Sequence, residues 1–248
     1  MRILISALAV LAITACEPTY VVPSSASGAS LPATAAPAAN RTVAQGTALL
    51  FQVAQRVEPI AESACQQETG RGGDFCDFHI QVEAGDQPNA YQSYANGRPI
   101  LTFNHAMLRT IRNENEVAFI LSHEAGHHIA GHLQRKQQQT GLGALAGALI
   151  VAGLGGDPQA GSDLGGAFGG RAYSQNFELE ADVLGTYIAE RAGYDPVDGA
   201  ASFARFAGSS SLLATHPPGT QRYSTVVATA RLIAAQRAQG ITPTIPRN

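Results

Sequence analysis

The sequence predicts an α+β fold that is mostly helical and contains a small antiparallel sheet. Apolar residues recur at helical spacing between positions 40 and 67, and again from position 113 onward. Between these regions, residues 78–82 alternate apolar and polar side chains, which is typical of a half-buried strand. The chain has 248 residues, 45% of them hydrophobic and 14% charged, so one folded domain is expected.

The N-terminus resembles the export signal of a bacterial lipoprotein. Residues 1–15 carry one positive charge and then an apolar run that is too short to span a bilayer. The run ends in Ile13-Thr14-Ala15-Cys16, which is similar to a lipobox. By this resemblance residues 1–15 are a signal peptide, and Cys16 is lipidated and anchors the chain to a membrane in the periplasm. An Asp in place of Glu17 would resemble an inner-membrane retention signal, so the outer membrane is favoured. The alternatives are an ordinary signal peptide and a buried helix.

The lipidated cysteine is followed by a segment with little tendency to fold. Residues 16–39 are rich in Pro, Ser, Ala and Thr and carry almost no charge, so we expect a disordered tether. The folded domain is expected over residues 40–239. Residues 240–248 are short, polar and Pro-containing, and we expect a flexible tail there.

Two further cysteines flank a Gly-rich polar stretch. Cys65 and Cys76 can pair in an oxidising periplasm, so a disulfide is expected. A pair of zinc ligands is the rival interpretation, but the ten intervening residues do not fit a compact Cys-x-x-Cys knuckle.

The order of the remaining elements follows from turn and cap signals. Asn96-Gly97 is a favoured pair for a tight hairpin turn, so strands are expected on both sides of it, at 89–94 and 99–103. Residues 141–170 are rich in Gly and Ala, and they fit a mobile flap, a membrane-touching element or a pair of small-residue helices. The other helices after the sheet are expected at 113–138, 176–192, 196–207 and 220–239.

The charge of the chain excludes one class of partner. The formal net charge is −3, and no cluster of Lys and Arg stands out along the sequence. A nucleic-acid-binding surface needs such a cluster, so nucleic acid is not an expected partner.

The most informative motif is His123-Glu124-Ala125-Gly126-His127, in the helix expected at 113–138. Residues four apart lie on one face of a helix, so both imidazoles can bind one Zn²⁺ at about 2.0–2.1 Å. Glu124 can take a proton from water that the zinc activates for attack on a peptide carbonyl. The motif therefore predicts a zinc-dependent peptidase with one ion per subunit. Two satisfied histidines in a buried helix are the alternative.

A catalytic zinc normally has a third protein ligand. The metzincin pattern requires Gly and His where this chain has Ala130 and Leu133, so that class is excluded. His128 points about 100° away from His127 on a helix, and His132 misses the metzincin position by one residue. We therefore expect both to be polar residues near the site and not ligands.

A second motif, Phe177-Glu178-Leu179-Glu180-Ala181-Asp182, carries a family resemblance. The chain is similar to the HtpX and CAAX-prenyl-protease-type zinc metallopeptidases, a gluzincin group with a soluble periplasmic lipoprotein branch. That family pairs H-E-x-x-H with E-x-x-x-D on a following helix. The resemblance implies that Glu178 is the third ligand and that Asp182 orients a ligand histidine. Glu180, two residues from Glu178, is expected to face solvent. Family members often carry Arg where this chain has Gln175.

The resemblance covers about residues 45–235 and implies a zincin-like metallopeptidase domain. In this class an edge strand holds the substrate extended, and 91–94 or 101–103 is the candidate strand. His216 is either a loop residue, a group that stabilises the oxyanion, or a latch on the zinc. Arg222 either binds substrate or supports the structure.

Together these implications describe an endopeptidase of envelope proteins that acts in protein quality control. Protein and peptide substrates are expected, and the outer-membrane assembly machinery is a candidate partner. Prenyl-protein processing is not carried over, because the multi-span architecture of those relatives is absent from this sequence. The alternative function is a latched, largely non-proteolytic chaperone or assembly factor.

Overall fold

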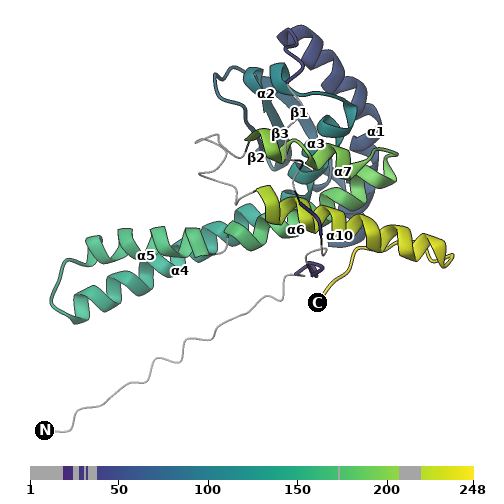
Figure 1. The fold of residues 1–248 in the computed structure, drawn as a ribbon. Coiled ribbons are helices and arrows are strands. Elements are labelled where there is room, and N and C mark those ends of the chain that lie inside the picture. The colour runs from purple at the N-terminus through teal and green to yellow at the C-terminus, as the bar shows by residue number, and fades with distance from the viewer. Residues whose placement is uncertain (1–18, 25–27, 31, 33–37, 173, 207–218) are drawn as a thin grey trace, which may run out of the picture.

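The computed structural model describes residues 19–24, 28–30, 32, 38–172, 174–206 and 219–248, without the side chains of 168–172, 174, 175, 205 and 206 (Figure 1). Cys16 and His216 lie outside the described residues. None of the described helices is both long enough and apolar enough to cross a membrane.

Helix α1 (Val43–Thr69) begins and ends at sequence-encoded caps. The Thr42 hydroxyl accepts a hydrogen bond from the Gln45 backbone N–H, and the Gln45 side chain accepts one from the Thr42 N–H, which together form a capping box. Gly70 ends the helix with a left-handed φ of 67°. The buried face of α1 includes Leu50 and Val53. It packs on the helix that carries the His123–His127 motif, called the zinc-motif helix below, and on the rest of the core.

The sheet contains β1 (His79–Glu83), β2 (Ala90–Ala95) and β3 (Arg98–Asn104), which in the described part of the chain lie in the order β1-β3-β2. β2 and β3 form the expected hairpin, and Asn96 and Gly97 both take positive φ at its turn.

The sheet is mixed, because β1 pairs with β3 in parallel. The expectation of a wholly antiparallel sheet is therefore corrected for this pair. β2 runs opposite to β1 but does not pair with it; β3 occupies the position beside β1 and runs in the same direction. As a result, β2 lies at an edge of the sheet.

After α2 (His105–Thr110), the single helix expected at 113–138 is two helices, α3 (Glu114–Ile129) and the first part of α4 (His132–Gly153). Gly131 separates them with a φ of 64°, a left-handed conformation that glycine adopts without a steric penalty. The break changes the chain direction immediately after the His123–His127 motif.

Helices α4 and α5 (Pro158–Ala172) lie side by side and project away from the rest of the domain (Figure 1). Of the three interpretations of residues 141–170, the structure shows the pair of small-residue helices. Their backbones touch where Gly147 meets Gly161, since a Cβ on Gly161 would lie 2.4 Å from the Gly147 carbonyl oxygen. The larger apolar side chains point outward and are exposed: Leu142, Leu145, Leu149, Ile150, Leu154 and Leu164.

The helix α6 (Ser174–Arg191) is packed between α3 and α10 (Gly219–Ala238). Every residue from Phe177 to Ala189 is buried, so this helix has no solvated face over that stretch. The helix expected at 196–207 is two short helices, α7 (Pro196–Ala200) and α8 (Phe203–Phe206).

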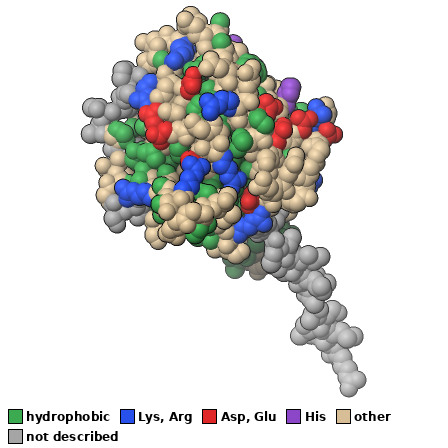
Figure 2. Space-filling model, turned by 90° about the vertical axis from the view of Figure 1, so that its right-hand side faces the viewer, with side chains coloured by type: hydrophobic (Ala, Val, Ile, Leu, Met, Phe, Trp, Pro, Cys, Tyr) green, Lys and Arg blue, Asp and Glu red, His purple; other side chains and the backbone are tan. Residues whose placement is uncertain are grey.

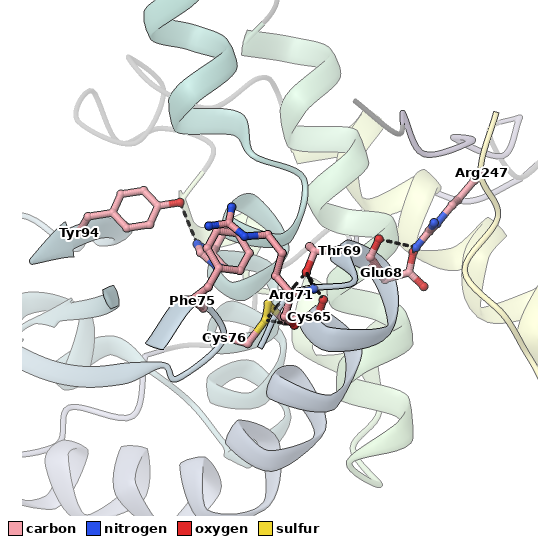
Figure 3. The surroundings of a disulfide bond; sticks show 9 residues. Cys65, Glu68, Thr69, Arg71, Phe75, Cys76, Tyr94 and Arg247 are labelled. Carbon is pink, nitrogen blue, oxygen red and sulfur yellow. Dashed lines mark hydrogen bonds and ion pairs between the residues drawn. A yellow bond between two sulfur atoms is a disulfide. The ribbon is translucent and has the colours of Figure 1, made fainter. Parts of the chain in front are cut away.

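Residues 245–248 are held to the domain, in place of the flexible tail that the sequence suggested. Ile245 is buried, and Arg247 pairs with Tyr20 in an isolated antiparallel bridge. The Arg247 guanidinium also donates to the Glu68 carboxylate at 2.6 Å, a contact drawn in Figure 3. The buried Tyr20 side chain belongs to the stretch expected to be a tether, so both segments contribute to the core.

The surface carries both signs of charge. On the face drawn in Figure 2, Lys and Arg side chains are interspersed with Asp and Glu side chains. This face therefore shows no extended basic surface of the kind that nucleic acid requires.

Candidate metal centre

The site forms where α3 and α6 cross at very short distance. A Cβ on Gly126 of α3 would lie 3.0 Å from the Ala181 carbonyl oxygen, and a Cβ on Gly185 of α6 would lie 3.0 Å from the His123 backbone nitrogen. Glycine at both positions lets the two backbones touch. The crossing brings the two sequence motifs face to face.

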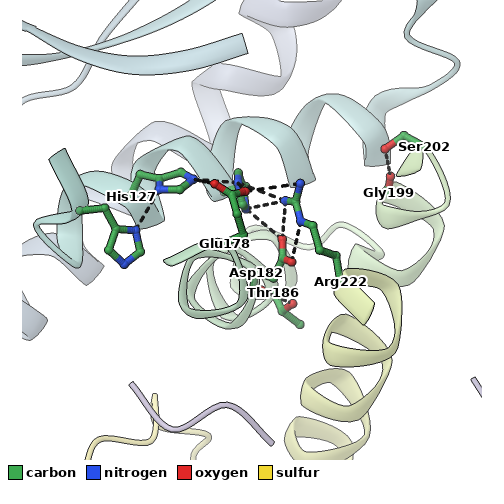
Figure 4. Close-up of polar contacts among 9 residues, drawn as sticks. His127, Glu178, Asp182, Thr186, Gly199, Ser202 and Arg222 are labelled. Carbon is green, nitrogen blue, oxygen red and sulfur yellow. Dashed lines mark hydrogen bonds and ion pairs between the residues drawn. The ribbon is translucent and has the colours of Figure 1, made fainter. Parts of the chain in front are cut away.

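Three side chains converge at this crossing: His123 and His127 from α3, and Glu178 from α6. Figure 4 shows His127 and Glu178 pointing toward one another. The two Nε2 atoms lie 3.0 Å apart, and each lies 3.3 Å from a carboxylate oxygen of Glu178. His123 and Glu178 are buried, and the His127 side chain is 14% exposed. The resemblance implied this set of residues, and the structure brings it together.

These positions fit a zinc ion. Two ligand atoms that each lie 2.0–2.1 Å from a tetrahedral zinc are about 3.3 Å from one another. The separation of the two Nε2 atoms, 3.0 Å, is close to that value, and so is the 3.3 Å from each Nε2 to its nearer Glu178 oxygen, Oε2 for His123 and Oε1 for His127. Two imidazoles and one carboxylate also match the donor set of a catalytic zinc site, which leaves one coordination position open.

The outer nitrogen of His123 is held by a carboxylate and an arginine. Asp182 Oδ1 lies 2.9 Å from His123 Nδ1, and Arg222 donates to both oxygens of Asp182, at 2.9 and 2.7 Å. Burial and the charge of Arg222 act to lower the pKa of His123, but hydrogen bonds to Asp182 and Glu178 outweigh them and raise it to about 9. The surrounding carboxylates therefore favour a positive charge at this place.

Arg222 is buried, and its contacts help to decide between the two roles expected for it, substrate binding and structural support. Its guanidinium lies over the Phe203 ring at 4.0 Å, and its Nη1 lies 3.5 Å from Glu178 Oε2. It also donates hydrogen bonds to the Asp182 carboxylate, as Figure 4 shows. These contacts favour structural support over direct substrate binding. They also supply an ion pair to the candidate ligand Glu178 from α10, whereas the side chain of Gln175 lies outside the described residues.

The outer nitrogen of His127 is held by a second histidine. His132 Nδ1 lies 2.9 Å from His127 Nδ1, and His132 Nε2 lies 3.2 Å from Glu180 Oε2. Burial lowers the pKa of His132 to about 3 despite the hydrogen bond with Glu180, so this ring is neutral at neutral pH.

The prediction that Glu180 faces solvent is wrong. Glu180 is buried and accepts a hydrogen bond from Arg135 Nη1 at 2.8 Å in addition to its contact with His132. The face of α6 opposite Glu178 is covered by the start of α4, which the sequence interpretation had placed in a continuation of the zinc-motif helix. The Ala130-Gly131 pair is the signal that could have indicated the break.

A pocket opens beside the three converging side chains. It is lined by Glu124 and His127 on one side and by Tyr91 and Gln92 of the edge strand β2 on the other. Glu124 is buried at the pocket wall. The pocket therefore places a carboxylate and the edge strand next to the three converging side chains. It is also lined by Asn89, Ala90, His132, Leu133, Lys136, Phe177 and Glu178.

His128 does not join the three converging side chains; it links α3 to β2 and to the loop that contains Phe75. Its Nδ1 lies 2.8 Å from the Tyr94 hydroxyl of β2, and its Nε2 lies 2.7 Å from the Phe75 carbonyl oxygen. Phe75 is adjacent to Cys76, which forms a disulfide with Cys65 (Figure 3). Burial lowers the pKa of His128 to about 4.

The comparisons with known proteins agree with this geometry. The chain matches the family model of peptidase family M48 over residues 52–230. It is 32% identical over 132 residues to a beta-barrel assembly-enhancing protease of Yersinia pestis, and 31% identical over 132 residues to the protein of that name in Escherichia coli K12.

Each of these two alignments covers 48% of this chain and 26% of the relative, so the chain spans about a quarter of the length of the curated relatives it matches. No solved structure matches the chain significantly. The family match covers well over half of the residues and includes both motifs of the site. The chain therefore belongs to peptidase family M48.

Proposed function

We propose that this protein is a zinc-dependent endopeptidase with its active site at the crossing of α3 and α6. The observation that carries the proposal is the spacing of His123, His127 and Glu178, whose ligand atoms all lie within 4.8 Å of one another. Glu124 is beside them in an open pocket. In this assignment the three residues hold one Zn²⁺ per subunit.

In this reaction, Glu124 acts as the general base. Zinc, when bound, makes a coordinated water acidic, with a pKa near 7, and polarises the substrate carbonyl. The Glu124 carboxylate takes the proton of the attacking water and passes it to the leaving amine. Asp182 keeps the His123 ring in one orientation, because its carboxylate lies 2.9 Å from His123 Nδ1 and is itself held by Arg222 of α10.

The edge strand β2 is the surface on which the substrate is held. Of the two segments that the sequence suggested, 101–103 lies in the central strand β3, whereas 91–94 lies in β2 and part of it lines the pocket. A strand at the edge of a sheet has unpaired backbone groups that an extended peptide can join. A peptide added to β2 passes directly beside Glu124.

We further propose that the protein works in the periplasm as an outer-membrane lipoprotein that is anchored through Cys16. This localisation is supported by the lipobox-like Ile13-Thr14-Ala15-Cys16 and by a disulfide, a bond typical of oxidising compartments. Envelope proteins that fail to fold are then the substrates. The name shared by the relatives supports the outer-membrane assembly machinery as a partner.

The test compares wild type with Glu124→Gln, which keeps the size of the side chain but removes the base. Zinc content and the cleavage of casein and of an unfolded outer-membrane protein are measured on both. We expect equal zinc content and a loss of cleavage of about 10²–10⁴-fold in Glu124→Gln. A wild-type protein that binds no zinc, or a variant that cleaves as fast as wild type, would overturn the assignment.

The alternative of a latched chaperone is tested on the same substrates with His216→Ala. If His216 occupies the open zinc position, cleavage by His216→Ala exceeds that of wild type. If the protein only binds its clients, none of the three proteins cleaves any substrate.

A further inference from the structure

We propose that His132 and Glu180 form a positioning arm that fixes the orientation of the ligand His127. The inference rests on the proposed zinc site, and it assigns a role to two residues to which neither sequence motif gave one. The arm runs from α6 to α3 by way of the first residue of α4, with separations of 3.2 Å and 2.9 Å.

The break at Gly131 is what allows the arm to form. In an uninterrupted helix, His132 would follow His127 by five residues and lie about 140° away from it around the axis. The left-handed φ of 64° at Gly131 starts a new helix whose first residue turns back toward the ligand. The Nδ1 atoms of His127 and His132 are therefore within hydrogen-bond distance, although the two residues belong to different helices.

The chemistry of the two rings gives the arm a direction. A neutral imidazole has one N–H donor and one acceptor nitrogen. If His127 binds metal through Nε2, its proton is on Nδ1 and is donated to His132 Nδ1. His132 then carries its own proton on Nε2 and donates it to the Glu180 carboxylate. Each link has one donor and one acceptor, so a single arrangement of protons satisfies all of them.

The arm is held rigid by its surroundings. The His132 ring is stacked on the Phe177 ring, with centroids 4.5 Å apart and an angle of 12° between the planes. Arg135 lies over the same Phe177 ring at 4.5 Å and also donates to Glu180. Phe177 directly precedes the ligand Glu178, so the packing that fixes the arm also fixes the turn of α6 that carries the third ligand.

Each ligand histidine is thus supported by a carboxylate on α6. His123 is supported directly by Asp182, and His127 is supported through an intervening imidazole by Glu180. Carboxylates that hold the outer nitrogen of a ligand histidine fix its tautomer and raise its basicity, and their loss typically lowers metal affinity by 10–100-fold.

The test measures zinc affinity by competition with a chelator of known affinity. His132→Phe keeps a ring over Phe177 but removes both nitrogens, and Glu180→Gln keeps the shape but removes the charge. In His132→Phe the Glu180 carboxylate keeps its ion pair with Arg135, so it is not left without a partner. His79→Phe, the same change at an exposed histidine of β1, is the control.

We expect His132→Phe to bind zinc about 10–100-fold more weakly than wild type, Glu180→Gln to show a smaller loss, and the control to show none. The double variant should lose no more than His132→Phe alone, because both changes interrupt one arm. The spectrum of bound Co²⁺ should shift in the same variants. The thermal unfolding of the metal-free proteins separates a folding defect from a local effect.

Affinities of His132→Phe and Glu180→Gln within two-fold of wild type would overturn the arm while leaving the zinc site intact. Additive losses in the double variant would contradict it too. If His132→Phe does not fold, Glu180→Gln decides alone. A wild-type protein without zinc affinity is a different result, since it refutes the proposed function itself.

Discussion

Gly185 on α6 lies against the backbone of His123 on α3, where a Cβ would come within 3.0 Å of both the nitrogen and the Cα of His123. This contact sets the distance between the helices that carry the two motifs. The site therefore depends on Gly185 as well as on its converging side chains, because a larger residue there would keep the two helices apart.

Replacing Gly185 by Ala should push the two helices apart. The added methyl group meets backbone, which cannot rotate away, so we expect a loss of stability of about 1–3 kcal/mol and weaker zinc binding. Urea unfolding and chelator competition measure the two effects. Gly141→Ala in α4 is the control, because nothing lies within 4 Å of a Cβ at that position. Equal behaviour of the two variants would contradict the close-packing argument.

Removing the charge of Arg222 alone should destabilise the fold more than removing the charges of Arg222 and Asp182 together. Arg222→Met leaves a fully buried carboxylate without its main partner, so we expect a loss of about 3–5 kcal/mol in the free energy of unfolding. The double variant Arg222→Met with Asp182→Asn should recover part of that loss. A double variant that is less stable than Arg222→Met alone would show that the pair is not the source of the effect. Chemical denaturation of wild type, Arg222→Met, Asp182→Asn and the double variant measures the cycle.

Asp198 should make the stability of the domain depend on pH in the acid range. Burial acts to raise the pKa of Asp198, but hydrogen bonds from Asn115, Asn113 and Arg112 outweigh it and lower the pKa. The group therefore stabilises the fold above its unfolded pKa of about 3.9, and the contribution is lost as pH falls through the lower folded value. These contacts join α7 to the start of α3.

The corresponding experiment follows the unfolding free energy of wild type and Asp198→Asn from pH 7 to pH 2. Wild type should be the more stable protein at neutral pH, and the difference should close below about pH 3.9. The same substitution at the exposed Asp86 serves as the control. A difference that stays constant over the whole range would refute the linkage.

Opening the Cys65–Cys76 disulfide should loosen the neighbourhood of the site as well as lower stability. The bond closes a loop with a sequence separation of 11, for which chain entropy gives a stabilisation of about 3 kcal/mol. The loop contains Phe75, whose carbonyl accepts from His128 on the zinc-motif helix. Thermal unfolding with and without dithiothreitol should show a drop for wild type and no change for a Cys65→Ser, Cys76→Ser double variant.

The sequence predicted two of the three side chains of the site because their spacing is a property of regular helices. His123 and His127 share a face in any α-helix, and the resemblance supplied Glu178 on a second helix. The arrangement of the hairpin was equally predictable, since Asn96-Gly97 encodes its turn by local backbone preference alone. These features depend on short stretches of chain.

The parts that the sequence did not predict depend on contacts between distant segments. The position of Glu180 is decided by the break at Gly131, which brings α4 over a face of α6 that helical periodicity alone would leave to solvent. The parallel pairing of β1 with β3 and the docking of Arg247 beside Tyr20 also join segments far apart in the chain. Periodicity reports the faces of an element but not which neighbour covers them.

The rod formed by α4 has a mechanical consequence. Its 22 residues extend about 33 Å from His132, which contacts the candidate ligand His127, to an exposed end near Leu154. A displacement of the far end is transmitted along the helix to His132, where the stacked Phe177 ring and the Glu180 carboxylate oppose it.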